Sequence, residues 1–230
     1  TQLNVKSDDF LPKTHQIVPL TYIFSKVHHL NASQSQIIIK WFWKTSFSDR
    51  YSSSTDAKID EDIAFFDEVI EMKFDTIKTY KINVTKDSLK KQKFLRNSPN
   101  VKAFLLFLAQ YNPLDLTNGQ NVDAGEALSF YNKKEYHHIF PQAYLKRSGV
   151  ESIDINSICN FCFLPSNSNK IISDKEPSDY IKNVTPALYK EAILKSNLMP
   201  LEMEIYEKND FETFIENRAE LIYNEIMRKI

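Results

Sequence analysis

The chain has 230 residues, of which 42% are hydrophobic and 13% aromatic, enough for a packed core in one large domain or two small ones. Its formal net charge of −1 gives no overall basic field, which argues against a non-specific DNA-coating protein but allows a nuclease with a local basic cleft. The longest apolar run, 101–109, is too short to cross a bilayer, no signal peptide is visible, and two cysteines make no disulfide framework, so we expect a cytoplasmic protein without a membrane partner.

The first half of the chain has the apolar spacing of helices. The pattern predicts helices over 16–30, 33–47, 60–72, 86–97 and 98–112. We expect Ser33 or Ser35 to cap the second of these helices. Ser98 is expected to cap the last, with Pro99 at its first helical position.

Three other features belong to the first half. The sequence Trp-Phe-Trp at 41–43 could be a base-stacking platform, but its helical spacing favours aromatic packing in the core. Residues 76–84 have the pattern of a short strand. The turn-rich segment 112–126 is the best candidate for a domain boundary.

The second half begins with a different pattern. Residues 134–140 are expected to form a strand, and 141–149 a short helix or turn that ends at Gly149. A second strand is predicted over 161–164, followed by a helix that Ser166 or Asn167 can cap. Two C-terminal helical patterns, 185–197 and 209–230, complete the chain, and the second is strongly amphipathic.

The order strand, loop, strand, helix carries the residues with candidate chemistry. His137 and His138 are adjacent on the first strand, so in a regular strand their side chains point to opposite faces and have different roles. A neutral imidazole, with an ordinary pKa of roughly 6.5, can take a proton from water. An asparagine near the start of the helix can offer an oxygen to a hard divalent cation. Such a set suits metal-assisted hydrolysis of a phosphodiester.

The sequence "HHIFPQAYL…ICNFCFLPSNSNKIIS" resembles the HNH nuclease motif of the ββα-metal fold. In this resemblance Asn160 opens the second strand, and Asn169 follows nine positions later on the helix. The resemblance implies that His138 is the general base and that His137 and Asn169 bind the metal, Mg²⁺ or Mn²⁺. It also implies that Asn160 braces the loop that carries the base and orients the imidazole. His137 occupies the first metal-ligand position, where Asp or Glu is common in the family, and a histidine ligand would also accept Ni²⁺ or Zn²⁺.

The resemblance extends beyond the motif. The stretches "KWFWKTSFSDRYSSSTDAKIDEDI" and "FETFIENRAELI" are similar to the C-terminal half of GmrSD-type restriction proteins. In that family an N-terminal nucleotide-sensing domain precedes a helical region and the HNH domain, so we expect that domain or partner to be missing from this chain. The resemblance implies restriction of phage DNA, including DNA with modified bases, in a bacterial cytoplasm.

These inferences give an α+β fold that is mostly helical. We expect a helical domain over 1–125, an HNH ββα-metal module over 126–182, and C-terminal helices over 183–230 that pack on the module. One ββα site cuts one DNA strand, so cleavage of both DNA strands would need a homodimer or two separate cleavage events.

Arg50 and Tyr51 match the family's "RYSS" stretch, but the sequence assigns them no physical role.

Several features have ordinary alternatives. His28–His29 is another histidine pair, but it has no asparagines at motif spacing and is expected to end a helix. Cys159 and Cys162 form one CxxC without the further ligands of a structural zinc site, so we expect at least one buried thiol and no structural zinc. Lys170 adjoins Asn169 and is a candidate phosphate contact, although such lysines usually belong to a solvated face.

Three functions remain open from the sequence. The favoured one is a divalent-metal-dependent DNA endonuclease. The second is a helical DNA- or partner-binding module whose HNH region is inactive without the missing N-terminal domain. The third is a structural scaffold in which the histidines hold Zn²⁺.

Overall fold

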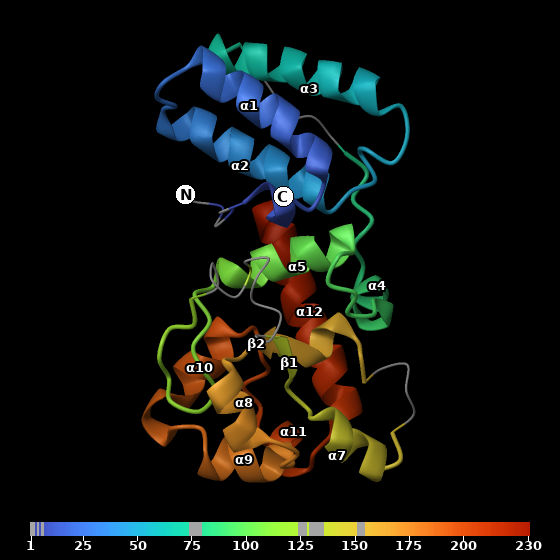
Figure 1. Ribbon diagram of the computed structural model, residues 1–230, viewed down its shortest axis with the longest axis vertical. Helices are drawn as coiled ribbons and strands as arrows, with labels where there is room; N and C mark the ends of the chain where they lie inside the picture. The colour runs from blue at the N-terminus through green and yellow to red at the C-terminus, as the bar shows by residue number, and fades with distance from the viewer. Residues whose placement is uncertain are drawn as a thin grey trace.

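The computed structural model describes residues 3, 5, 7–73, 80–123, 128, 136–150 and 155–230. These residues are mostly helical and include one small two-stranded antiparallel sheet, which confirms the expected α+β class with mainly helical content. In Figure 1 the helices of the N-terminal third lie at one end of the molecule, and the strands and later helices lie at the other. The expected domain boundary at residues 125 and 126 lies outside the described residues.

The first half of the chain forms five α-helices in the described residues. They are α1 (Ile17–Lys26), α2 (Ala32–Ser46), α3 (Thr55–Ile70), α4 (Lys86–Lys91) and α5 (Pro99–Ala109), preceded by 3-10 turns at Asp8–Phe10 and Thr14–Gln16. The prediction that Ser33 or Ser35 caps α2 is wrong. Asn31 is the N-cap, because its side chain accepts from the Gln34 N–H while the Gln34 side chain accepts from the Asn31 N–H.

The aromatic residues of α2 form the core of the first half. Trp41 and Phe42 have 0% exposure and Trp43 has 1%, so the expectation of core packing is confirmed. Trp41 meets Phe66 of α3 edge-on at 4.8 Å between ring centroids, and Trp43 meets Phe107 of α5 at 5.6 Å. Such aromatic pairs stabilise beyond the area they bury, so they fix α2 against both neighbouring helices.

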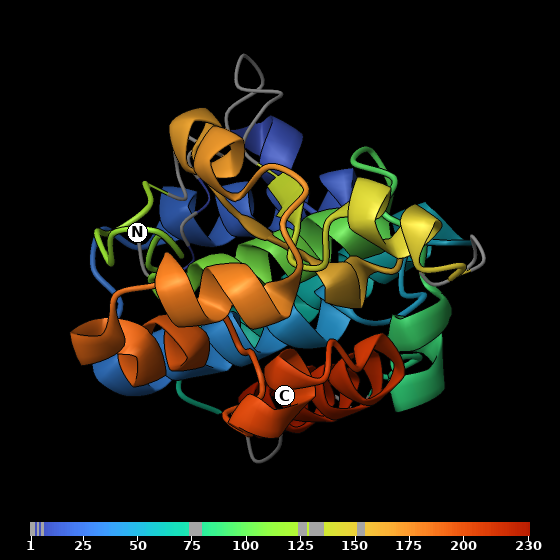
Figure 2. The ribbon, with the colours of Figure 1, turned by 90° about the horizontal axis from the view of Figure 1, so that it is seen from below.

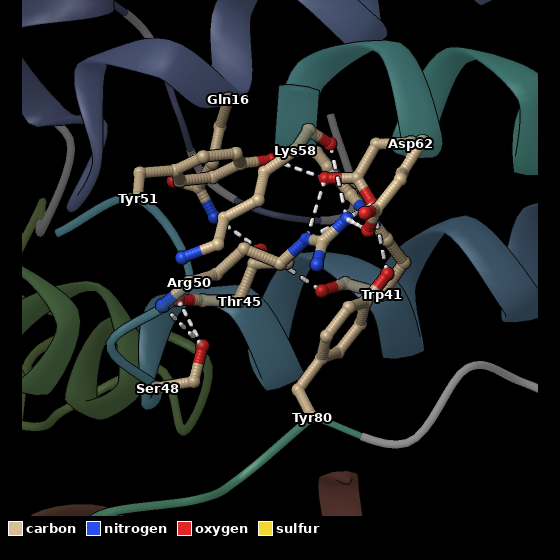
Figure 3. Close-up of polar contacts among 10 residues, drawn as sticks. Gln16, Trp41, Thr45, Ser48, Arg50, Tyr51, Lys58, Asp62 and Tyr80 are labelled. Atoms are coloured by element: carbon tan, nitrogen blue, oxygen red, sulfur yellow. Dashed lines mark hydrogen bonds and ion pairs between the residues drawn. The ribbon is translucent and has the colours of Figure 1, made fainter. Parts of the chain in front are cut away.

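A buried polar cluster around Asp62 of α3 holds the loop after α2 (Figure 3). The Asp62 carboxylate accepts from the Arg50 guanidinium at 2.8 to 3.1 Å, from Tyr51 Oη at 2.6 Å and from Tyr80 Oη at 2.9 Å. Asp62 has 0% exposure, and burial among these groups raises the pKa of both tyrosines. This cluster gives Arg50 and Tyr51 a structural role, because together they compensate a buried carboxylate.

The helix predicted over 86–97 ends early. After α4 the chain runs extended, and the Phe94 N–H donates to Asn156 O at 2.8 Å while the Ile158 N–H donates to Gln92 O at 2.8 Å. Pairing with a distant segment therefore replaces the second half of that helix. In the predicted strand 76–84, residues 76–79 lie outside the described residues, and Ile82 makes one isolated antiparallel bridge with Ser48.

The second half contains the strands and the remaining helices. They are β1 (Tyr136–His138), α7 (Gln142–Arg147), β2 (Phe161–Phe163), α8 (Ser166–Ile172), α9 (Pro177–Asn183), α10 (Lys190–Ser196), α11 (Met203–Glu207) and α12 (Phe211–Lys229), with 3-10 turns at Ile158–Asn160 and Ala187–Tyr189. The predicted order of strand, loop, strand and helix is confirmed, although residues 134 and 135 lie outside the described residues.

The helix predicted from residue 166 differs in two details. It breaks into α8 and α9, and Ser173 at the break has a φ of 53°. The expected cap by Ser166 or Asn167 is wrong, because both residues are already helical and Pro165, which has no side-chain donor or acceptor, is the N-cap. A proline with a φ of −58° is already suited to this turn.

Helix α12 packs against the first half of the chain through α4. It runs beside α4, as Figures 1 and 2 show, and Lys86–Glu220 and Lys90–Glu216 ion pairs join the two helices. These pairs are partly exposed, so each adds little stability. The predicted amphipathic face is confirmed by the burial of its aromatic and aliphatic residues. Among the described residues, every helix is too short or too polar to span a membrane.

Candidate functional site

The two strands place the histidines of the motif. Strands β1 and β2 are antiparallel, with His137 opposite Cys162 and His138 opposite Phe161. Neighbouring residues on a strand point to opposite faces, so the two imidazoles lie on different sides of the pair. The His138 ring packs against Phe161, with 4.3 Å between ring centroids, while the His137 carbonyl accepts a weak bond from Cys162 Sγ at 3.8 Å.

His138 is oriented by a hydrogen bond. Its Nε2 lies 3.0 Å from Asn156 Oδ1. An amide oxygen can only accept, so this contact favours the tautomer that is protonated on Nε2 and has its lone pair on Nδ1. Burial lowers the pKa of His138, the Asn156 contact opposes this shift, and the neighbouring His137 adds to it. At neutral pH the ring is therefore uncharged and able to accept a proton.

Asn160 braces the chain immediately after β1. Its side chain is fully buried: Oδ1 accepts from the Phe140 N–H at 2.9 Å, and Nδ2 donates to Phe140 O at 3.1 Å and Ile155 O at 3.0 Å. The Asn160 carbonyl also accepts from the Ile139 N–H at 2.8 Å. A buried amide that satisfies both polar groups of one residue fixes the direction in which the chain leaves His138.

Asn169 and Lys170 lie on α8, which follows β2 after two residues. The Asn169 N–H donates to Pro165 O at 2.9 Å within the helix, and its half-buried side chain makes no hydrogen bond within the described residues. Its amide oxygen therefore remains available for a ligand. Lys170 is exposed, and His137 is half-buried. No hydrogen bond joins the Asn169 side chain to either histidine in the part of the chain that the structure describes.

A second buried carboxylate fixes α8. Ser168 Oγ donates to Asp115 Oδ2 at 2.5 Å, and Thr117 donates to Asp115 Oδ1 from both its N–H, at 2.7 Å, and its hydroxyl, at 2.9 Å. Asp115 is 3% exposed, so these donors replace its lost hydration. Because Ser168 precedes Asn169, the contact also fixes the position of the proposed metal ligand.

Sequence reasoning missed two residues that support the site. Asn156 bonds His138, but it lies in a loop where nothing in the sequence distinguishes it from a turn residue. Arg218 of α12 is fully buried and donates to four backbone carbonyls, those of Cys159, Phe161, Asn197 and Leu198. Two of these carbonyls flank Asn160, so Arg218 holds the bracing segment in place. Its position on the apolar face of α12 is a signal that the sequence does contain.

The cysteines behave as buried thiols. Cys159 and Cys162 have exposures of 0% and 1%, and burial raises their pKa values to about 11 and about 12. Both thiols are free and both are buried, which confirms the expectation that at least one is buried. Within the residues that can be described, no three His, Cys, Asp or Glu side chains lie close enough together to hold a metal ion. A site of His137 and Asn169 would offer two protein ligands, one an imidazole and the other an amide oxygen.

Comparisons with known proteins give a relative without an assigned activity. The chain is 30% identical over 220 residues to "Uncharacterized protein MJ0686" of Methanocaldococcus jannaschii. The match covers 83% of this chain but 37% of the relative's length, so the chain spans little more than a third of that protein. No family model and no solved structure matches the chain.

Proposed function

We propose that the chain is a divalent-metal-dependent DNA endonuclease of the HNH type. The observation that carries the proposal is the buried Asn160 amide, which binds both polar groups of Phe140 just after the strand that bears His138. These bonds hold the backbone that follows His138 and so fix the orientation of that histidine. Asn169 stands on the helix that follows, in the order of strand, strand and helix that the motif requires.

His138 is the proposed general base. Its uncharged ring donates through Nε2 to Asn156, so Nδ1 would take the proton from the attacking water. The His138 ring is also packed against Phe161, which limits its rotation. Because the ring is already oriented and uncharged, the reaction requires neither ordering of the imidazole nor its prior deprotonation.

His137 and Asn169 would hold the metal. The donor set fits a divalent ion such as Mg²⁺ or Mn²⁺, since an amide oxygen suits hard cations and an imidazole suits transition metals. Two neutral ligands bind such an ion weakly, so water and a substrate phosphate must complete its coordination. When bound, the ion supplies stabilisation of the charge that develops on the phosphate.

A cleavage assay with matched histidine variants tests the proposal. We expect the wild-type chain to nick plasmid DNA in Mg²⁺ or Mn²⁺ and EDTA to stop it. His138→Ala should lower the rate by about 10² to 10⁴, the usual contribution of a general base. His28→Ala is the matched control, because His28 belongs to the exposed second histidine pair. Equal rates for His138→Ala and wild type would contradict the proposal.

The same assay separates the alternatives. DNA binding without metal-dependent cutting would favour the binding module that needs an N-terminal domain. Stoichiometric zinc in the purified protein, lost in His137→Ala, would favour the scaffold. Plasmid, modified phage DNA and RNA as parallel substrates would test the restriction role, and a change from nicks to double-strand breaks with protein concentration would support a homodimer.

A further inference from the structure

A basic hollow lies beside the candidate site. Its volume is about 440 Å³, within the usual range for small-ligand sites. The hollow is lined by Asp9, Phe10, Arg96, Asn97, Lys102, Leu105 and Tyr136. These residues come from three parts of the sequence: the first 3-10 turn, the segment between α4 and α5 together with α5 itself, and the first residue of β1.

The chemistry of the lining favours an anion. Among the lining residues that the structure describes, Arg96 and Lys102 carry positive charges and Asp9 a negative one, so the formal balance of these residues is positive. The Arg96 guanidinium lies 5.8 Å from the centre of the Tyr136 ring. A cation placed over an aromatic face at this distance is held before a ligand arrives, so less side-chain freedom is lost on binding. Phe10 and Leu105, 8% and 2% exposed, form an apolar floor.

The hollow adjoins the face of the strand that carries His138. Tyr136 and His138 are two residues apart on β1, so their side chains share one face, separated by roughly 6.6 Å along the strand. Phe94 connects them: its ring stacks on Phe161 at 4.0 Å and lies 5.6 Å from Tyr136, while Phe161 contacts His138. A DNA strand with one phosphate at His138 could therefore place the neighbouring nucleotide at the hollow.

We propose that this hollow binds the phosphate of the nucleotide that flanks the cleaved bond, through Arg96 and Lys102. Tyr136 is a positioning residue, because its ring orients the Arg96 guanidinium. This inference rests on the proposed nuclease function and assigns a substrate contact outside the motif. A free nucleotide has the same phosphate chemistry as a DNA strand, so the experiment must distinguish the two.

The test measures DNA binding and its salt dependence in the full chain. A dye-labelled single-stranded oligonucleotide is titrated with His138→Ala protein, which is expected to bind without cutting, over a range of salt concentrations. Arg96→Gln and Lys102→Gln should each weaken binding about five- to tenfold and reduce the slope of log K against log salt by about 0.7. Arg96→Lys should keep most of the slope, since it keeps the charge.

Lys208→Gln is the matched control, because Lys208 is an exposed lysine outside this lining. Circular dichroism must show that each variant is folded. Slopes for Arg96→Gln and Lys102→Gln equal to the control would overturn the inference, as would failure of the parent protein to bind DNA. The inference would also be overturned if binding of a free deoxynucleoside monophosphate depended on Arg96 while binding of the oligonucleotide did not. That result would assign the hollow to a free nucleotide.

The two proposals fail in different ways. If Arg96→Gln and Lys102→Gln change neither plasmid cutting nor DNA affinity, the phosphate-binding role of the hollow is rejected and the nuclease proposal stands. If these variants bind DNA more weakly but the chain never cuts DNA, the nuclease proposal is rejected and a DNA-binding role of the hollow stands.

Discussion

Replacing Asn160 by alanine should disconnect the strand that carries His138 from the loop that braces it. The substitution removes three hydrogen bonds, one accepted from Phe140 and two donated to Phe140 and Ile155. All the atoms involved are buried, and Phe140 has 0% exposure. Water therefore has no open route to the groups that lose their partner.

The expected loss of stability follows from these contacts. Each hydrogen bond contributes about 1 kcal/mol net, which gives about 3 kcal/mol for three. The buried Phe140 N–H left without an acceptor adds roughly 1 to 2 kcal/mol more. We expect Asn160→Ala to lower the free energy of unfolding by about 3 to 5 kcal/mol. Asn160→Asp should do no better, because it turns a carboxylate oxygen toward two carbonyl oxygens.

Urea unfolding followed by two probes measures the effect. Both tryptophans, Trp41 and Trp43, lie in α2, so fluorescence reports on the first half, while circular dichroism reports on all helices. Coincident transitions would show that the two halves unfold together. Asn169→Ala is the control: its side chain makes no hydrogen bond in the described residues, so it should lose cleavage but less than about 1 kcal/mol of stability. A loss below about 0.5 kcal/mol for Asn160→Ala would refute the bracing role.

Three other predictions concern buried groups. Asp62→Asn should cost about 3 kcal/mol, since it removes the buried carboxylate of Arg50 and leaves only the exposed pair with Glu61, and a urea titration that finds no change would contradict the structure. Arg218→Met should cost about 3 kcal/mol or more, because four buried carbonyls lose their donor, and Arg218→Lys should recover only part of this in the same titration. Cys159 and Cys162 should resist alkylation at pH 8 in the native protein but react in urea. The raised pKa values keep both thiols protonated at pH 8, because the reactive thiolate forms only as the pH rises through the pKa. Rapid labelling of the native protein, counted by mass spectrometry, would disprove this.

The sequence was sufficient wherever a local pattern is strong. Helices with a clear apolar face, such as α2 and α12, appear at the predicted places because burying one face is enough to define them. The two short strands were also predicted, since each is an aromatic and apolar run beside turn residues. The resemblance to the HNH motif likewise implied a bracing role for Asn160, whose buried side chain bonds Phe140.

Tertiary structure decided the features that depend on distant partners. Gln92–Phe94 leave the predicted helix because Asn156 and Ile158, from a distant part of the chain, form hydrogen bonds with the backbone groups of Gln92 and Phe94. Asn156 becomes the partner of His138 through the same pairing.

Asp62 and Arg218 illustrate the same limit. Each occupies the apolar face of its helix, which marks it as unusual, but the groups that compensate its charge come from other segments. A one-dimensional pattern can indicate that a charged side chain is buried, whereas only the folded chain determines which donors or acceptors surround it. The reason is physical: the cost of burial is local, while its compensation is supplied by residues that only folding brings into contact.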